Sequence, residues 1–72
     1  MLIGVQVENG KLHELKVSDR ATVLDLQLAI EEETDIVPQM QLIFYGGIEL
    51  DDEHKLLTGW EMSSGAVVYL AI

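Results

Sequence analysis

The chain has 72 residues, and about half of them are apolar, which is enough for the core of one small domain. It contains no Cys, so disulfides and thiolate zinc sites are excluded. Thirteen acidic residues against four basic ones give a formal net charge of −9. Four scattered Lys and Arg residues cannot neutralise a row of phosphates, so we expect no nucleic-acid or membrane partner.

No apolar run approaches the roughly 20 residues of a membrane span, and Met1 does not begin a signal-peptide pattern. We therefore expect a domain of the cytoplasm, the nucleus or both. The acidity has two interpretations that stay open here, because net charge serves solubility and also attracts partners with basic groups.

Two segments of alternating hydrophobicity open the chain, at residues 1–7 and 11–17. The Asn9-Gly10 pair between them is the strongest short signal for a hairpin, since both residue types tolerate the positive φ angles of a tight turn. The sequence predicts an antiparallel hairpin with one buried face.

The hydrophobic period then changes to that of a helix. Thr22, with Asp25 three residues later, is typical of a capping box at a helix start. Val23, Leu26 and Ile30 recur at helical spacing and predict a buried stripe, and Asp35 is a plausible stop.

Leu24 and Leu28 lie well around the predicted helix from the buried stripe. Two interpretations stay open for them: they pack under a loop, or they form a minor contact surface.

The rest of the chain predicts short elements. A strand at residues 41–45 is followed by a Gly46-Gly47 turn, a short strand at 48–50, the acidic loop 51–55 and a turn of helix after Leu56. Residues 66–72 form a last strand of high propensity. One helix must then cover one face of a mixed four- or five-stranded sheet, with the first and last strands parallel at its centre. This α+β arrangement is a β-grasp.

The order and spacing of several segments resemble ubiquitin and the ubiquitin-like domains over the whole chain. These segments are MLIGVQV, NGK, TVLDLQLAI, IVP, QLIF, LTGWEM and AVVYLAI. The resemblance implies one ubiquitin-like domain over residues 1–72, monomeric and part of a longer protein. It also implies that Val68, Leu70 and Ile72 face the helix.

The resemblance further implies a binding surface on the outer face of the sheet, the face away from the helix. With the alignment taken one residue shorter before Leu42 and one longer near Tyr45–Gly46, Ile43 falls at the centre of ubiquitin's main binding patch. The other residues that the resemblance assigns to this patch are Gly47, Ile48, Tyr69, Ala71 and Glu8. An exposed apolar surface on a small domain commonly marks an interface.

This resemblance implies a non-catalytic interaction module of the ubiquitin–proteasome pathway. Its expected partners are a ubiquitin-interacting-motif helix, a proteasome receptor or ubiquitin itself. The chain stops at Ile72 without the Gly-Gly tail of a conjugated modifier, and most lysines that form ubiquitin chains are replaced, Lys11 excepted. Two alternatives stay open: a conjugatable modifier whose tail is absent from this chain, and a charge-paired β-grasp scaffold that uses the acidic loop 51–55.

Catalytic and metal chemistry find little support in the sequence. His13 and His54 are the only imidazoles, and Ser63 and Ser64 have no neighbouring base. The acidic loop 51–53 lacks the ligand spacing and central Gly of an EF-hand. We expect no enzyme activity, no cofactor and no metal.

Overall fold

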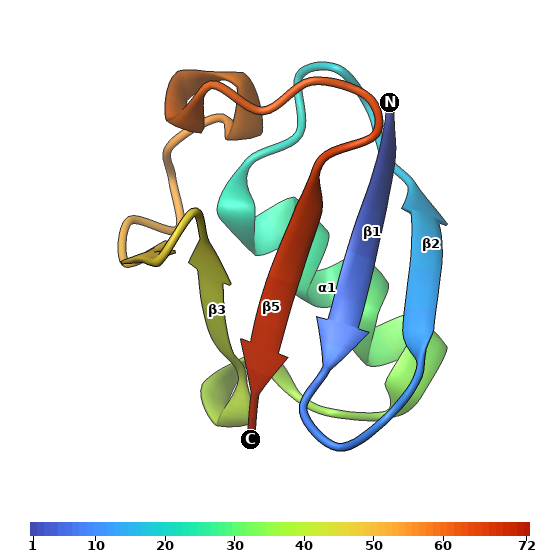
Figure 1. Cartoon of the computed structure of the whole chain (residues 1–72). Coiled ribbons are helices and arrows are strands. Elements are labelled where there is room, and N and C mark those ends of the chain that lie inside the picture. The colour runs from blue at the N-terminus through green and yellow to red at the C-terminus, as the bar shows by residue number, and fades with distance from the viewer.

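The computed structural model describes all residues 1–72 and consists of one sheet with one helix lying across one face (Figure 1). The strands are β1 Leu2–Val7, β2 Leu12–Lys16, β3 Leu42–Tyr45, β4 Ile48–Glu49 and β5 Val67–Ala71, and the helix is α1 Val23–Thr34. The order across the sheet is β2-β1-β5-β3-β4, with β1 and β5 parallel and every other pair antiparallel. The predicted β-grasp is confirmed.

The first hairpin forms as its sequence predicts. Asn9 adopts a positive φ of 57°, and the Gly10 N–H donates to the Val7 carbonyl at 3.0 Å. The Gln6 side-chain amide bonds the Val7 and Gly10 carbonyls. The turn is therefore closed by both backbone and side-chain hydrogen bonds.

The predicted limits of α1 are also confirmed. The Asp25 N–H donates to the Thr22 hydroxyl at 3.2 Å, and the Thr22 N–H donates to the Asp25 carboxylate at 2.9 Å, which completes a capping box. Asp35 ends the helix in the left-handed conformation, with its N–H on the Glu31 carbonyl. Both ends of the helix are therefore capped by hydrogen bonds between residues close to it in sequence.

The core lies between the helix and the inner face of the sheet. The helix contributes the expected stripe of Val23, Leu26 and Ile30, all fully buried. The other buried apolar residues are Ile3, Val5, Leu15, Ala21, Ile43, Leu50, Leu57, Met62, Val68 and Leu70. These residues form one contiguous hydrophobic core, so their burial contributes most of the stability of the domain.

Two short 3-10 helices complete the chain, η1 Pro38–Met40 and η2 Leu57–Trp60. Trp60 packs against the core with its indole N–H unpartnered, and the Lys55 ammonium lies 4.4 Å from the centre of its ring. Trp60 is thus held by packing and a cation–π contact rather than by a hydrogen bond. No helix has the length and apolarity that crossing a bilayer requires.

Two predicted positions are wrong. Ile43 is only 2% exposed and pairs with buried Leu70, so it faces the helix and not the outside of the sheet. Because side chains alternate along a strand, Leu42 and Phe44 take the outer face instead. Ile72 was expected to face the helix, but β5 ends at Ala71 and Ile72 is 65% exposed.

Candidate functional site

The outer face of the sheet carries a large apolar surface. Even-numbered residues of β1, β2 and β3 and odd-numbered residues of β5 point to this side, because their neighbours in sequence fill the core. We call the apolar members of this set the outer-face patch: Leu2, Leu12, Leu42, Phe44, Val67, Tyr69 and Ala71. Five of them are among the exposed large hydrophobic residues of the chain.

The strand register sets the patch in rows. Phe44 on β3 lies opposite Tyr69 on β5, and Tyr69 lies opposite Gln6 on β1. Directly opposed residues on neighbouring strands have Cβ atoms about 4.5–5.5 Å apart, so the two aromatic rings are neighbours. Leu42 and Ala71 form the next row. The aromatic pair therefore stands where two strands from distant parts of the chain meet.

Gly4 allows the patch to close over β1. A Cβ placed on Gly4 would lie 3.1 Å from Val67 Cγ2 and 3.4 Å from Leu12 Cδ1. Side chains from β5 and β2 thus meet above a strand that has no side chain of its own at that point. At Gly4 the apolar surface consequently extends across β2, β1 and β5, whereas the polar Gln6 lies between Leu12 and Tyr69 in the neighbouring row.

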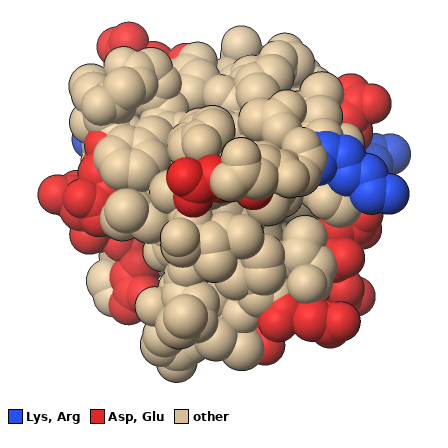
Figure 2. Space-filling view, turned by 60° about the horizontal axis from the view of Figure 1, so that its bottom comes forward, with Lys and Arg blue, Asp and Glu red and all other residues tan.

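Charged residues lie mainly around the outer-face patch rather than within it. Glu49 lies opposite Phe44 at the β4 edge, and Glu14 and Lys16 stand on the β2 edge. Figure 2 looks obliquely from the end of the sheet at which β1 and β5 finish. It shows an uncharged area, broken by a small acidic spot, with Asp and Glu gathered on both sides and basic side chains mostly on the right side. The rim is therefore mainly acidic.

Two of the predicted site residues, Ile43 and Ile48, do not lie as expected, whereas Gly47 does. Ile43 belongs to the core. Gly47 is in the predicted turn, with a φ of 80°, and so marks the edge of the sheet. Ile48 is exposed at that edge but pairs with Tyr45, which packs against the core, so it projects from the opposite side of the hairpin to Phe44 and Glu49.

The other predicted residues do border the patch. Tyr69 is 43% exposed, and Ala71 is half-buried opposite Leu42. Glu8 lies at the end of β5, where its N–H donates to the Leu70 carbonyl and its carboxylate accepts from the Ile72 N–H at 3.2 Å. Glu8 is thus fixed beside the last strand.

Sequence reasoning missed Phe44, Leu42 as a patch member, and Glu49 at its rim. A signal for them was present in the Gly46-Gly47 turn. A two-residue turn pairs Tyr45 with Ile48 and hence Phe44 with Glu49. Because Glu49 is charged, this pairing marks the outer face, and Phe44 belongs on it.

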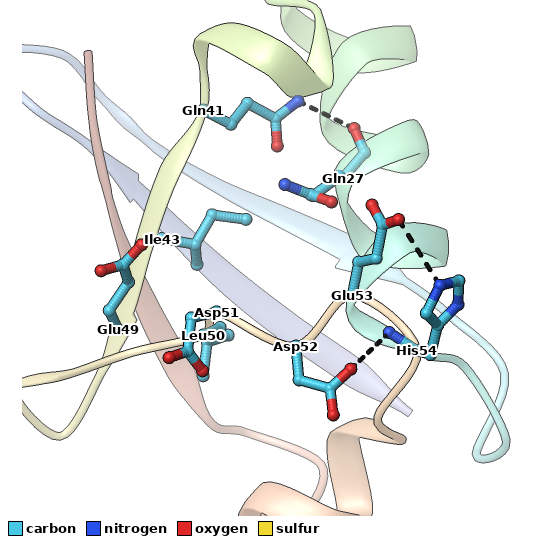
Figure 3. Close-up of a pocket in the computed structure, with 9 residues that line it drawn as sticks. All are labelled: Gln27, Gln41, Ile43, Glu49, Leu50, Asp51, Asp52, Glu53 and His54. Atoms are coloured by element: carbon cyan, nitrogen blue, oxygen red, sulfur yellow. Dashed lines mark hydrogen bonds and ion pairs between the residues drawn. The ribbon is translucent and has the colours of Figure 1, made fainter.

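Beside the sheet edge lies a polar depression of about 460 Å³ (Figure 3). The Gln41 amide bonds the Gln27 carbonyl there, the His54 N–H donates to the Asp52 carboxylate at 3.1 Å, and His54 Nε2 is 3.6 Å from the Glu53 carboxylate. No group of three or more His, Asp and Glu side chains is close enough to hold a metal ion.

The two helix leucines lie on the other side of the domain from the patch. Leu28 is 48% exposed and Leu24 is half-buried, and both line a groove between α1 and the segment that includes Pro38. Of their two interpretations, packing under a loop does not describe Leu28, which is open to solvent, and both interpretations stay open for the half-buried Leu24.

The fold, the helix caps and the register of the central strands are all those of a β-grasp domain built on one helix. A family model described as the Ubiquitin family matches residues 3–72, which is nearly the whole chain. The chain belongs to the ubiquitin family.

Proposed function

We propose that this ubiquitin-like domain is a non-catalytic interaction module that binds protein partners through the outer-face patch, with Phe44 and Tyr69 as its anchors. The observation that carries the proposal is the apolar surface that Phe44, Tyr69, Val67 and Leu12 form on a domain that is otherwise strongly acidic. Contiguous exposed apolar surface with a polar rim is typical of interfaces. Aromatic side chains at the centre of such a surface are typical anchors.

The proposed partners belong to the ubiquitin–proteasome pathway: ubiquitin, a ubiquitin-interacting-motif helix or a proteasome receptor. The rim favours those that bring basic groups, because Glu49, Glu14 and Glu8 lie around the patch, whereas Lys16 stands at its β2 edge. Like charges facing each other across an interface oppose association, so partners with acidic rims should bind weakly. Ubiquitin, with its basic patch, is the best matched of the three.

The test is an amide chemical-shift titration of the domain with ubiquitin and, separately, with a ubiquitin-interacting-motif helix. Shifts should cluster on Leu42, Phe44, Val67 and Tyr69. Phe44→Ala should weaken binding roughly ten-fold or more, because interface energy concentrates in a few desolvated side chains. Shifts elsewhere, with Phe44→Ala binding normally, would refute the proposal.

A further inference from the structure

A second surface lies on the helix side of the domain, away from the outer-face patch. A groove of about 530 Å³ runs between α1 and the segment that leads into η1. Leu24 and Leu28 of the helix form one wall, and Val37 and Pro38 form the other. Glu31 and Glu53 also line the groove. We call this the helix groove.

Hydrogen bonds hold the walls of the helix groove at a fixed separation. The Gln41 amide donates to the Gln27 carbonyl of α1 at 2.9 Å and to the Ile36 carbonyl of the opposite wall at 2.8 Å. At the start of the helix, the Leu24 N–H donates to the Glu53 carbonyl at 3.0 Å. The groove is therefore formed before any partner arrives, which lowers the entropic cost of binding.

The apolar part of the groove has no cover within the chain. Leu28 is 48% exposed and Val37 is 40% exposed, and neither belongs to the core. Met40 of η1, whose N–H donates to the Val37 carbonyl at 2.9 Å, is also exposed. An occupant that placed apolar side chains between Leu28 and Val37 would remove this surface from water.

The charges around the groove are all of one sign. Glu31 and Glu53 line it, and a second depression that shares Leu28 and Glu31 adds Glu32 and Asp35. No Lys or Arg forms an ion pair with any of these four carboxylates, and the last turn of α1 contains no basic residue. The one imidazole beside them is that of His54, whose Nε2 lies 3.6 Å from the Glu53 carboxylate. At the end of the groove beside Glu31, the negative end of the helix dipole adds to this field.

This field identifies the occupant by its charge. A second copy of the chain would bring another −9, and an anionic membrane surface would likewise be repelled. A segment with apolar and basic side chains would bury Leu28 and Val37 and neutralise Glu31 and Glu53 together. We propose that the helix groove binds a basic amphipathic segment of a partner protein, independently of the outer-face patch.

The experiment uses a peptide of four Lys-Leu-Leu-Lys repeats as the probe, titrated into the isotope-labelled domain. Amide shifts should cluster on Leu24, Leu28, Glu31 and Val37. Leu28→Ala should lower the affinity roughly ten-fold, as expected for an anchor at the centre of an interface. The same titration with four Glu-Leu-Leu-Glu repeats should give no binding, because the acidic groove repels a negatively charged peptide. This peptide is a matched control, since its apolar content is equal and only the charge differs.

A pair of charge variants separates the groove from the general acidity of the chain. Glu31→Gln with Glu53→Gln should weaken peptide binding several-fold and reduce its dependence on salt. Asp19→Asn with Glu61→Gln removes the same charge from exposed positions outside both the groove and the outer-face patch and should have much less effect. Phe44→Ala should bind the peptide as the unmodified domain does.

Several results would overturn the proposal. Equal effects of the two charge pairs would mean that the peptide responds to net charge alone. Shifts on Phe44 and Tyr69 would assign the peptide to the outer-face patch. If the domain self-associates without peptide and Leu28→Ala abolishes this association, the occupant of the groove is a second copy of the chain. If the domain binds phosphatidylcholine vesicles and this binding requires Leu28, the occupant is lipid.

Discussion

Phe44 and Tyr69 lie directly opposite each other on β3 and β5, on the face of the sheet that the helix does not cover. They are the only pair of aromatic residues among the opposed positions of β3 and β5, and they are 25 positions apart in the sequence. The two residues are brought together by the antiparallel pairing of β3 with the central strand β5.

Replacing Phe44 or Tyr69 by Ala should weaken binding of an outer-face partner by roughly ten-fold or more each. The two effects should be less than additive, since the residues are in contact and each truncation disturbs the environment of the other. Isothermal titration of the single and double variants measures this. Strict additivity would show that the two rings act separately.

Ile43→Ala should act on stability and not on binding. Ile43 is buried among the core residues, and removing a large aliphatic side chain from such a site costs about 2–5 kcal/mol in the free energy of unfolding. Denaturant unfolding measures the loss, and the neighbouring Phe44→Ala is the matched control, with a smaller loss expected. If Ile43→Ala unfolds like the unmodified chain but fails to bind, the register of β3 is wrong.

The contrast between Ile43 and Phe44 also shows where sequence reasoning ended. The hairpin at Asn9 and the capping box at Thr22 were predictable, because each depends on residues close in sequence that satisfy one another's hydrogen bonds. The parallel pairing of the first and last strands followed from the need to bury one helix. These features are local, or are forced by the number of elements.

The register of β3 was not local in this sense. Leu42, Ile43 and Phe44 are all apolar, so the alternation that normally distinguishes the two faces of a strand is absent. A one-residue offset in the alignment then assigned the side chains of β3 to the wrong face of the sheet. Without that offset, the centre of the patch is assigned to Phe44, in agreement with the pairing of Phe44 with Tyr69.

Loss of the helix cap should lower stability without affecting either binding surface. In Thr22→Ala the Asp25 N–H loses its side-chain acceptor, and capping residues of this kind contribute about 1 kcal/mol. Thermal unfolding followed by circular dichroism measures the change. Thr58→Ala is the control, because Thr58 is exposed and its hydroxyl has no partner; an equal loss in both variants would contradict the capping role.

Asp35→Gly should stabilise the domain. Asp35 ends α1 with a φ of 63°, a conformation that glycine adopts more readily than residues with a Cβ, and its carboxylate stands at the negative end of the helix dipole. The two effects together predict a gain of about 0.5–1 kcal/mol in the free energy of unfolding. Glu61→Gly is the matched comparison, since Glu61 has a φ of 66° but follows only the short η2. A gain equal to that of Asp35→Gly would assign the whole effect to backbone strain.

Association with a basic partner at the outer-face patch should slow as salt is added, while dissociation changes little. The chain carries −9, and Glu49 and Glu14 stand at opposite edges of the patch, so its field attracts a positive partner before contact. Such attraction is screened beyond about 8–10 Å at physiological ionic strength and acts mainly on the association rate. Stopped-flow mixing with ubiquitin at a series of salt concentrations measures both rates. Glu49→Gln with Glu14→Gln should flatten the salt dependence of association more than Glu31→Gln with Glu32→Gln, which removes equal charge from the helix side. An association rate that does not respond to salt in the unmodified domain would leave its acidity as a matter of solubility alone.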